Sequence, residues 1–296
     1  MKISFIGAGN VAWHLSQAFE NAGNSVQEVF SRDPKKAKEL GSFLYNARVQ
    51  EHLDFSESTS EVFFMCIPES AYPQVLPELI LPKYGILVLV SGTAQLAESM
   101  LLYDPLRESM NQIGVFFPVQ HVLTGRKLNL SNTPICVEVL VEETETSLLA
   151  LAKDVSDAIY LVNGDERKKI RLAMLMAGTF TQQLWNQAKE LLTSIELEPQ
   201  LVQGLVENYM KSFFSNHPIS PAQEAAKLQE LIMNEPNPDE ITNEIAEIEL
   251  SIGNIARVIQ GQPAAQQGLG QPAQQAGLSG DTPITIGDIT RTLDAL

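Results

Sequence analysis

The chain has 296 residues, of which 44% are hydrophobic, so it can bury a sizeable core in one large domain or two ordinary ones, and we expect two. Its formal charge is −16, from 20 basic and 36 acidic residues, and the acidic excess is present on both sides of Gly164. This charge disfavours non-specific binding to nucleic acid or to an anionic membrane, so we expect neither as a partner.

A short strand, a glycine-rich turn and a helix open the chain. In the run KISFIGAGNVAWHLSQAF, residues 2 to 19, Gly7, Gly9 and Ala12 stand in the order G-x-G-x-x-A between strand and helix. In dinucleotide-binding proteins the first glycine allows a tight turn, the second lets the backbone approach a pyrophosphate, and the third small residue lets helix and strand pack closely. The alternative is a glycine-rich turn that binds nothing. We expect a dinucleotide site formed by Gly7, Ala8, Gly9, Asn10 and Val11, with the helix N-terminus adding free N–H groups.

The second strand, SVQEVF, ends in residues that bear on the choice of cofactor. NAD-binding proteins place Asp or Glu at this strand end, on the ribose hydroxyls, whereas Ser31 and Arg32 stand here. A hydroxyl and a guanidinium suit the negatively charged 2′-phosphate, so the sequence favours NADP over NAD. Asp33 leaves both cofactors open, because it can cap the helix PKKAKEL that follows or turn to the ribose hydroxyls of NAD.

Short apolar runs alternate with helical patterns up to about residue 163. They are ISFI, SVQEVF, VFFMCI, ILVLVS, IGVFF, ICVEVL and IYLV. Fully apolar strands such as VFFMCI and ILVLVS are typical of a sheet covered by helices on both faces. We therefore expect residues 1–163 to form a dinucleotide-binding α/β domain with a doubly wound, mainly parallel sheet.

After NGDERKK the pattern becomes helical, which predicts an all-α second domain over residues 164–296. Its first element is one long helix, IRLAMLMAGTFTQQLWNQAKELLTSI. A later run places isoleucines four and three residues apart from Ile241 to Ile259, which fits packing within the domain or a contact between subunits. Residues 260–280 are rich in Gln, Ala, Gly and Pro and have too few large apolar side chains to offset chain entropy, so they predict a mobile loop.

Nothing in the sequence indicates a metal site, a disulfide or a membrane span. Cys66 and Cys136 lie far apart in apolar runs, which predicts buried, reduced thiols. The N-terminus begins with a strand rather than a signal peptide, and no apolar segment approaches about 18 residues. We therefore expect a cytoplasmic protein.

Six segments carry a resemblance to a known family. They are FIGAGNVAWHL, VFSRDP, FFMCIPESAYPQVLPEL, VLVSGT, GVFFPVQ and ERKKIRLAMLMAGTFTQQLWNQAKELL. Together they resemble the NADP oxidoreductases that join a Rossmann-like domain to a C-terminal helical domain of unknown function. That family is similar to pyrroline-5-carboxylate reductases and to deazaflavin-dependent NADP reductases. The resemblance covers residues 1 to about 215 and is recovered at SGDTPITIGD.

The resemblance implies an NADP-dependent oxidoreductase with a small carbonyl or imine substrate in an interdomain cleft. It also implies a homodimer built through the helical domain, and a nicotinamide near Ser91 and Gly92. The residues themselves agree, because ligands in such sheets bind beyond the carboxyl ends of strands, where IPES and VSGT stand. We therefore expect Ile67, Pro68, Ser91 and Gly92 in the cofactor site.

Three positions depart from the family. Its members commonly carry His where this chain has Phe117, Asn where it has Thr179, and Arg where it has Ile286. Polar positions have thus become apolar or smaller, which leaves open a second hypothesis, an NADP-binding protein without turnover that serves as a sensor or an assembly subunit. We favour the enzyme because the dinucleotide turn and the VSGT segment are intact.

Hydride transfer needs a donor that stabilises charge on the substrate heteroatom. The candidate donors are Ser91, His121, Thr179 and Gln183. His121 lies four residues after Phe117, on the order of 13 Å along an extended chain, so it does not simply replace the missing histidine. Thr179 and Gln183 lie one helical turn apart, so they can face a cleft together or be ordinary polar residues of a helix pair. We take Ser91, Thr179 and Gln183 as the predicted catalytic residues.

Overall fold

The computed structural model of the chain describes residues 1–103, 112–120 and 129–214. The chain divides into two compact units, Met1–Leu175 and Met176–Leu296. The predicted mobile loop at 260–280, the isoleucine run, His121 and Ile286 lie outside the described residues.

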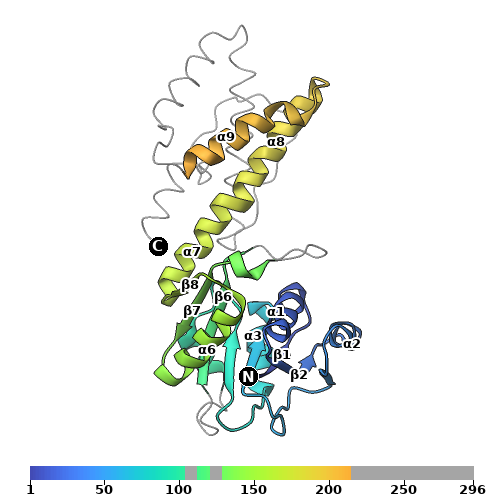
Figure 1. Cartoon of the computed structure of the whole chain (residues 1–296), viewed down its shortest axis with the longest axis vertical. Coiled ribbons are helices and arrows are strands. Elements are labelled where there is room, and N and C mark those ends of the chain that lie inside the picture. Colours follow the sequence, from blue (N-terminus) through green and yellow to red (C-terminus); the bar gives the residue numbers. More distant parts are fainter. Residues whose placement is uncertain (104–111, 121–128, 215–296) are drawn as a thin grey trace, which may run out of the picture. The chain divides into compact units, whose positions relative to one another are not determined.

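The first unit is built on an eight-stranded sheet, whose strand order is β3-β2-β1-β4-β5-β6-β7-β8. Figure 1 labels β1, β2, β6, β7 and β8 of this sheet. The strands are β1 (Lys2–Ile6), β2 (Ser25–Phe30), β3 (Arg48–Gln50), β4 (Val62–Met65), β5 (Ile86–Leu89), β6 (Gln112–Pro118), β7 (Ile135–Val139) and β8 (Ile159–Leu161). Strands β1 to β6 are parallel, whereas β7 pairs antiparallel with β6 and parallel with β8. The predicted doubly wound, mainly parallel α/β sheet is therefore confirmed.

Helices cover both faces of this sheet. They are α1 (Asn10–Asn21), α2 (Pro34–Ser42), α3 (Tyr72–Val75), α4 (Leu96–Leu102), α6 (Glu142–Val155) and α7 (Gly164–Met174). Residues of α1, α2 and α6 pack with Phe64 of β4 in one buried cluster, while residues of α3 and α4 pack with Phe63 in another. Neighbouring residues of a strand point to opposite faces, so β4 supplies both layers of the core.

Helix α7 begins at a strong cap. Asn163 accepts hydrogen bonds from the N–H groups of Asp165 and Glu166, each at 3.0 Å, and Glu166 accepts one in return from the N–H of Asn163 at 2.8 Å. This reciprocal capping box starts the helix at Gly164, before the apolar run that predicted it. The first unit extends through α7 to Leu175, and the predicted domain boundary between residues 163 and 164 stays a prediction.

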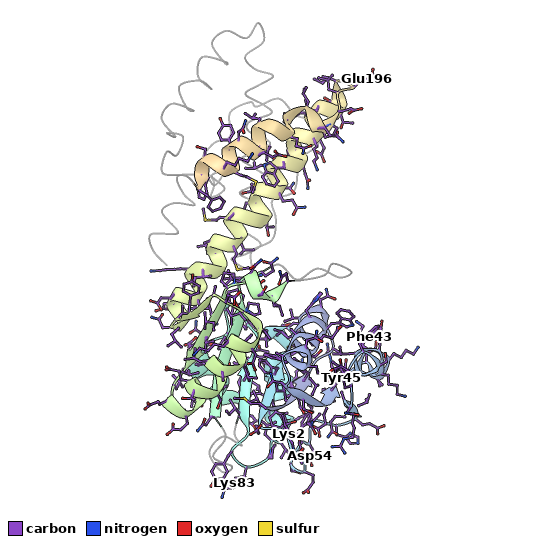
Figure 2. All side chains as sticks on the ribbon, in the orientation of Figure 1. Lys2, Phe43, Tyr45, Asp54, Lys83 and Glu196 are labelled. Atoms are coloured by element: carbon purple, nitrogen blue, oxygen red, sulfur yellow. The ribbon has the colours of Figure 1, made fainter. Side chains whose placement is uncertain are left out.

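The described part of the second unit is helical. A π-helical segment, Leu175–Phe180, leads into α8 (Thr181–Ser194), and α9 (Gln203–Phe213) follows a 3-10 turn at Pro199–Val202. Between α8 and the 3-10 turn the chain bends at Glu196, which has a φ of 60° (Figure 2). No described helix is long and apolar enough to cross a membrane.

Candidate functional site

A cavity of about 230 Å³ opens at the carboxyl ends of β1, β2 and β4. Its lining consists of Ile6, Gly7, Ala8, Gly9, Phe30, Ser31, Arg32, Asp33, Lys36, Cys66, Ile67, Pro68, Ala71 and Val75. Seven predicted cofactor residues are therefore brought together here. The other four, Asn10, Val11, Ser91 and Gly92, are not part of this lining.

The turn between β1 and α1 leaves no room for a side chain at Gly7. This residue has a φ of 110°, and its N–H donates to the carbonyl oxygen of Phe30 at 2.8 Å. A Cβ atom at this position would lie 2.4 Å from the carbonyl oxygen of Cys66. Glycine is therefore required by the conformation and by the close approach of the turn to the ends of β2 and β4.

The N-terminus of α1 has the character of an anion site. Gly9 is its N-cap, no side chain of a described residue caps the helix, and the first turn holds no acidic residue. A Cβ atom on Gly9 would meet no atom of the described residues within 4 Å, and Ala12 is fully buried against the sheet. The helix therefore presents N–H groups and a positive partial charge beside the cavity, with an open approach to its backbone.

The end of β2 places two cations on the cavity wall. Arg32 and Lys36 are both exposed, and in the described part of the chain neither forms an ion pair or a side-chain hydrogen bond. Asp33 uses its carboxylate to cap α2, accepting from the N–H of Lys35 at 3.0 Å. The Ser31 hydroxyl oxygen accepts from the N–H of Asp33 at 3.2 Å. Of the two roles that the sequence left open for Asp33, the structure shows the capping of α2. Lys36 is a cation of the cavity lining that the sequence reasoning missed.

The segments after β4 and β5 are joined through Glu69. Its carboxylate accepts the hydroxyl protons of Ser91 and Thr93, and the Thr93 hydroxyl lies 2.7 Å from each carboxylate oxygen. The Ser91 oxygen in turn accepts from the N–H groups of Thr93, at 3.0 Å, and Ala94, at 2.8 Å. Ser91 is therefore buried in a closed set of hydrogen bonds.

A buried arginine supports the same segment from α7. Arg167 is fully buried and pairs with Glu138 of β7, its Nε lying 3.1 Å from a carboxylate oxygen. Its guanidinium also donates to the carbonyl oxygens of Ser91, at 3.4 Å, and Ala94, at 2.7 Å. Because a buried guanidinium is stable only when its charge and N–H groups are satisfied, this set of partners fixes the segment after β5 firmly.

Gly92 lies between two large side chains. A Cβ atom there would be 2.9 Å from Cζ of Phe117 and 3.1 Å from Cδ of Arg171. Phe117, where the resemblance implies a histidine, is buried in the apolar cluster that also includes residues of α3 and α4. An aromatic ring therefore lies beside Gly92 at this point.

Two further polar groups near the cavity have raised pKa values. Cys136 is buried as predicted, whereas Cys66 is half-buried, because it stands at the carboxyl end of β4 on the cavity wall. Burial of its thiol raises the pKa of Cys66. Burial, with a smaller contribution from the negative charge of Glu69, raises the pKa of the Tyr72 hydroxyl, which has no hydrogen-bond partner among the described residues. Among the described residues, no three or more His, Cys, Asp or Glu side chains gather as metal ligands would.

Thr179 and Gln183 belong to the second unit. Thr179 lies in the π-helical segment and is exposed, while Gln183 lies in the first turn of α8 and is half-buried. A π turn holds more residues than an α turn, so the simple one-turn spacing assumed from the sequence does not apply across this segment. Their predicted catalytic role stays a prediction.

Two family models match the chain. Residues 2–95 match the family described as NADP oxidoreductase, coenzyme F420-dependent, and residues 133–223 match a domain of unknown function, DUF2520. The chain thus matches an NADP oxidoreductase model in its N-terminal part and this domain model further on. The two matches confirm the resemblance found in the sequence, and the first of them indicates an NADP-dependent oxidoreductase. No curated protein matches the chain significantly.

Several solved structures share the fold. A provisionally assigned NADP oxidoreductase from Bacteroides fragilis has 22% identity and a TM-score of 0.67, covering 88% of this chain and 98% of its own. A reductive aminase from Aspergillus terreus in complex with NADPH and ethyl levulinate has 14% identity and a TM-score of 0.58, covering 89% of this chain and 88% of its own. An imine reductase from Myxococcus stipitatus in complex with NADP+ has 14% identity and a TM-score of 0.54, with coverages of 89% and 96%. At these identities the likeness shows the fold.

Proposed function

We propose that the protein is an NADP-dependent oxidoreductase that transfers a hydride to or from a small carbonyl or imine substrate. The observation that carries the proposal is the cavity itself, which joins the Gly7–Gly9 turn to the free cations Arg32 and Lys36. The Gly7–Gly9 turn offers the open backbone that a pyrophosphate needs, and the two cations offer the positive charge that a 2′-phosphate needs. The NADP-bound imine reductase and reductive aminase of the same fold support the choice of reaction class.

Each part of the cavity has a distinct role in this proposal. The Gly7–Gly9 turn and the N-terminus of α1 hold the pyrophosphate, because the backbone there is open and its N–H groups are uncapped. Arg32 and Lys36 bind the 2′-phosphate, with Ser31 beside them. One carboxylate oxygen of Asp33 accepts the capping hydrogen bond of α2, so this residue has a structural role besides any contact with the cofactor.

The nicotinamide half of the cofactor is assigned to the carboxyl ends of β4 and β5. Strand β5 pairs in parallel with β4, so Ser91 and Gly92 follow at the sheet edge where Ile67 and Pro68 line the cavity. Bound NADPH supplies the hydride to the substrate. For the proton, the predicted donors are Ser91, Thr179 and Gln183, and the hydroxyl proton of Ser91 is already donated to Glu69. Thr179 and Gln183 are therefore the better candidates.

One observation favours the second hypothesis, a protein that binds NADP without turnover. Phe117 replaces the histidine of the family and is buried against the apolar cluster, where it cannot supply a proton. NADPH oxidation, followed by absorbance across a panel of imines, 2-oxo acids and flavin analogues including a deazaflavin, separates the two functions. The enzyme predicts oxidation with at least one class, at a rate that Arg32→Ala lowers at subsaturating NADPH. Tight NADPH binding with no oxidation by any class would favour the sensor.

We further propose that the second unit forms a homodimer. In the part of the second unit that the structure describes, no residue of α8 or α9 is buried. Large apolar side chains are exposed on these helices, on the turn between them and at the end of α9, among them Trp185, Leu201, Leu205, Phe213 and Phe214. Apolar surface of this kind is typical of a face that a second subunit covers.

A further inference from the structure

The carboxylate of Glu69 connects two segments that the backbone does not pair. Glu69 opens the 3-10 turn Glu69–Ala71 after β4, whereas Ser91 and Thr93 follow β5, 22 and 24 residues further along the chain. Both hydroxyls donate to this one carboxylate. Hydrogen bonds to a charged acceptor are stronger than those between neutral groups. The hydrogen bonds of Ser91 and Thr93 to Glu69, which we call the Glu69 bracket, therefore restrict how far the two segments can separate.

The bracket also sets the direction of the Ser91 hydroxyl. Its oxygen accepts from the N–H groups of Thr93 and Ala94, and a hydroxyl has one proton, which is donated to Glu69. Ser91 thereby closes the turn that contains Gly92. Arg167 holds the carbonyl oxygens of Ser91 and Ala94 from the other side, so Glu69 is the partner that ties this turn to the cavity wall after β4.

Glu69 itself is exposed, and this distinguishes it from the buried Arg167. An exposed carboxylate that orders two hydroxyls adds little to the core, because its side chain buries little apolar surface. Its position at the sheet edge between the cavity and Gly92 points to a different role. Ordering a loop before a ligand arrives lowers the entropy cost of binding.

We propose that Glu69 is a positioning residue for the nicotinamide half of the cofactor, acting through Ser91 and Thr93 to pre-order the Ser91–Gly92 turn. The proposal rests on the proposed function, since it assumes that the cofactor extends from the cavity across β4 to β5. Glu69 is not among the residues that line the cavity, where Gly7, Gly9 and Arg32 are proposed to bind the adenosine half. Loss of Glu69 therefore weakens binding of a ligand that has a nicotinamide and leaves a ligand without one unaffected.

The test compares NADPH with adenosine 2′,5′-bisphosphate, which carries the 2′-phosphate but no nicotinamide. Calorimetric titration of both ligands is made on wild type, Glu69→Ala, Glu69→Gln and the control Glu78→Gln, an exposed glutamate a few residues further on. Glu69→Ala is expected to lower NADPH affinity about tenfold and to leave the bisphosphate within about twofold. Glu69→Gln is expected to lose about threefold, because the amide oxygen still accepts one hydroxyl, and Glu78→Gln is expected to match wild type.

A second readout follows the nicotinamide directly. Its fluorescence emission in the bound state is expected to shift toward that of free NADPH in Glu69→Ala, because a looser turn leaves the ring more exposed to water. Equal losses for both ligands would show a general structural defect, and no loss for NADPH would show that Glu69 has no part in binding. Either result would overturn the proposal. If Glu69→Ala does not fold, Thr93→Val removes one arm of the bracket and is expected to weaken NADPH alone by about threefold. Failure of wild type to bind either ligand would instead refute the proposed function.

Discussion

Alanine at Gly7 and alanine at Gly9 should have different effects, because the two glycines meet different surroundings. Alanine at position 7 must adopt a φ of 110° and place its Cβ 2.4 Å from the carbonyl oxygen of Cys66. The left-handed backbone costs an L residue about 1–2 kcal/mol and relief of the short contact about 1–3 kcal/mol more, so Gly7→Ala should lower the free energy of unfolding by about 2–5 kcal/mol. At Gly9 the φ is −85° and a Cβ meets nothing within 4 Å, so alanine loses only the N-cap preference of glycine, about 1 kcal/mol or less.

NADPH affinity should show the reverse order, because among folded molecules Gly9→Ala should weaken binding more than Gly7→Ala does. The Cβ of Gly9→Ala stands where a pyrophosphate must approach the backbone, so its NADPH affinity should fall by about tenfold or more. Urea unfolding followed by circular dichroism gives the free energy of unfolding for both variants, and calorimetry gives the NADPH affinity. A Gly9→Ala variant that binds NADPH as tightly as wild type would refute the reasoning about the turn. So would a Gly7→Ala variant as stable as wild type.

Three other predictions concern the cavity and the second unit. Arg32→Ala and Lys36→Ala should each weaken NADPH binding by about tenfold, which is the lower end for a charge-assisted contact at an exposed position. Fluorescence titration should show NADH affinity unchanged in both variants. Equal losses of affinity for both cofactors would count against the 2′-phosphate contact. Burial raises the pKa of the Cys66 thiol, so at pH 8 Cys66 of the folded protein should react with iodoacetamide far more slowly than Cys66 of the unfolded chain. Rapid labelling of Cys66 in the folded protein, detected by mass spectrometry, would contradict this. Light scattering should give twice the chain mass of 32.6 kDa at micromolar concentration, and a monomer throughout would refute the homodimer.

Most of the sheet could be predicted from the sequence, because seven of its strands are runs of apolar residues between turn or helix signals. Strand β3 was missed, since Arg48–Gln50 is three residues long and has no apolar alternation. The reversal of β7 could not be predicted either, because an apolar run does not show its direction in the sheet. The long helix after the sheet was predicted as one element, but Leu175–Phe180 adopts a π-helical conformation that the apolar spacing does not reveal.

The candidate site was predictable where its parts are local. Gly7, Gly9 and Arg32 were found because the dinucleotide pattern lies within one strand-turn-helix-strand segment. Lys36 was missed although a signal existed, a basic residue in the first turn of α2, four residues after Arg32. Glu69 could not be found in this way, because its partners Ser91 and Thr93 are distant in sequence and meet only once β4 and β5 pair.

The central claim is that the cavity at the ends of β1, β2 and β4 binds NADP. Calorimetric titration of the wild-type protein with NADPH and with NADH in the same buffer tests this claim most directly. The contact of Arg32 and Lys36 with the 2′-phosphate is worth about 1.5–3 kcal/mol, so NADPH should bind about 10 to 100 times more tightly than NADH. Equal affinities for the two cofactors, or no binding of NADPH, would contradict the account.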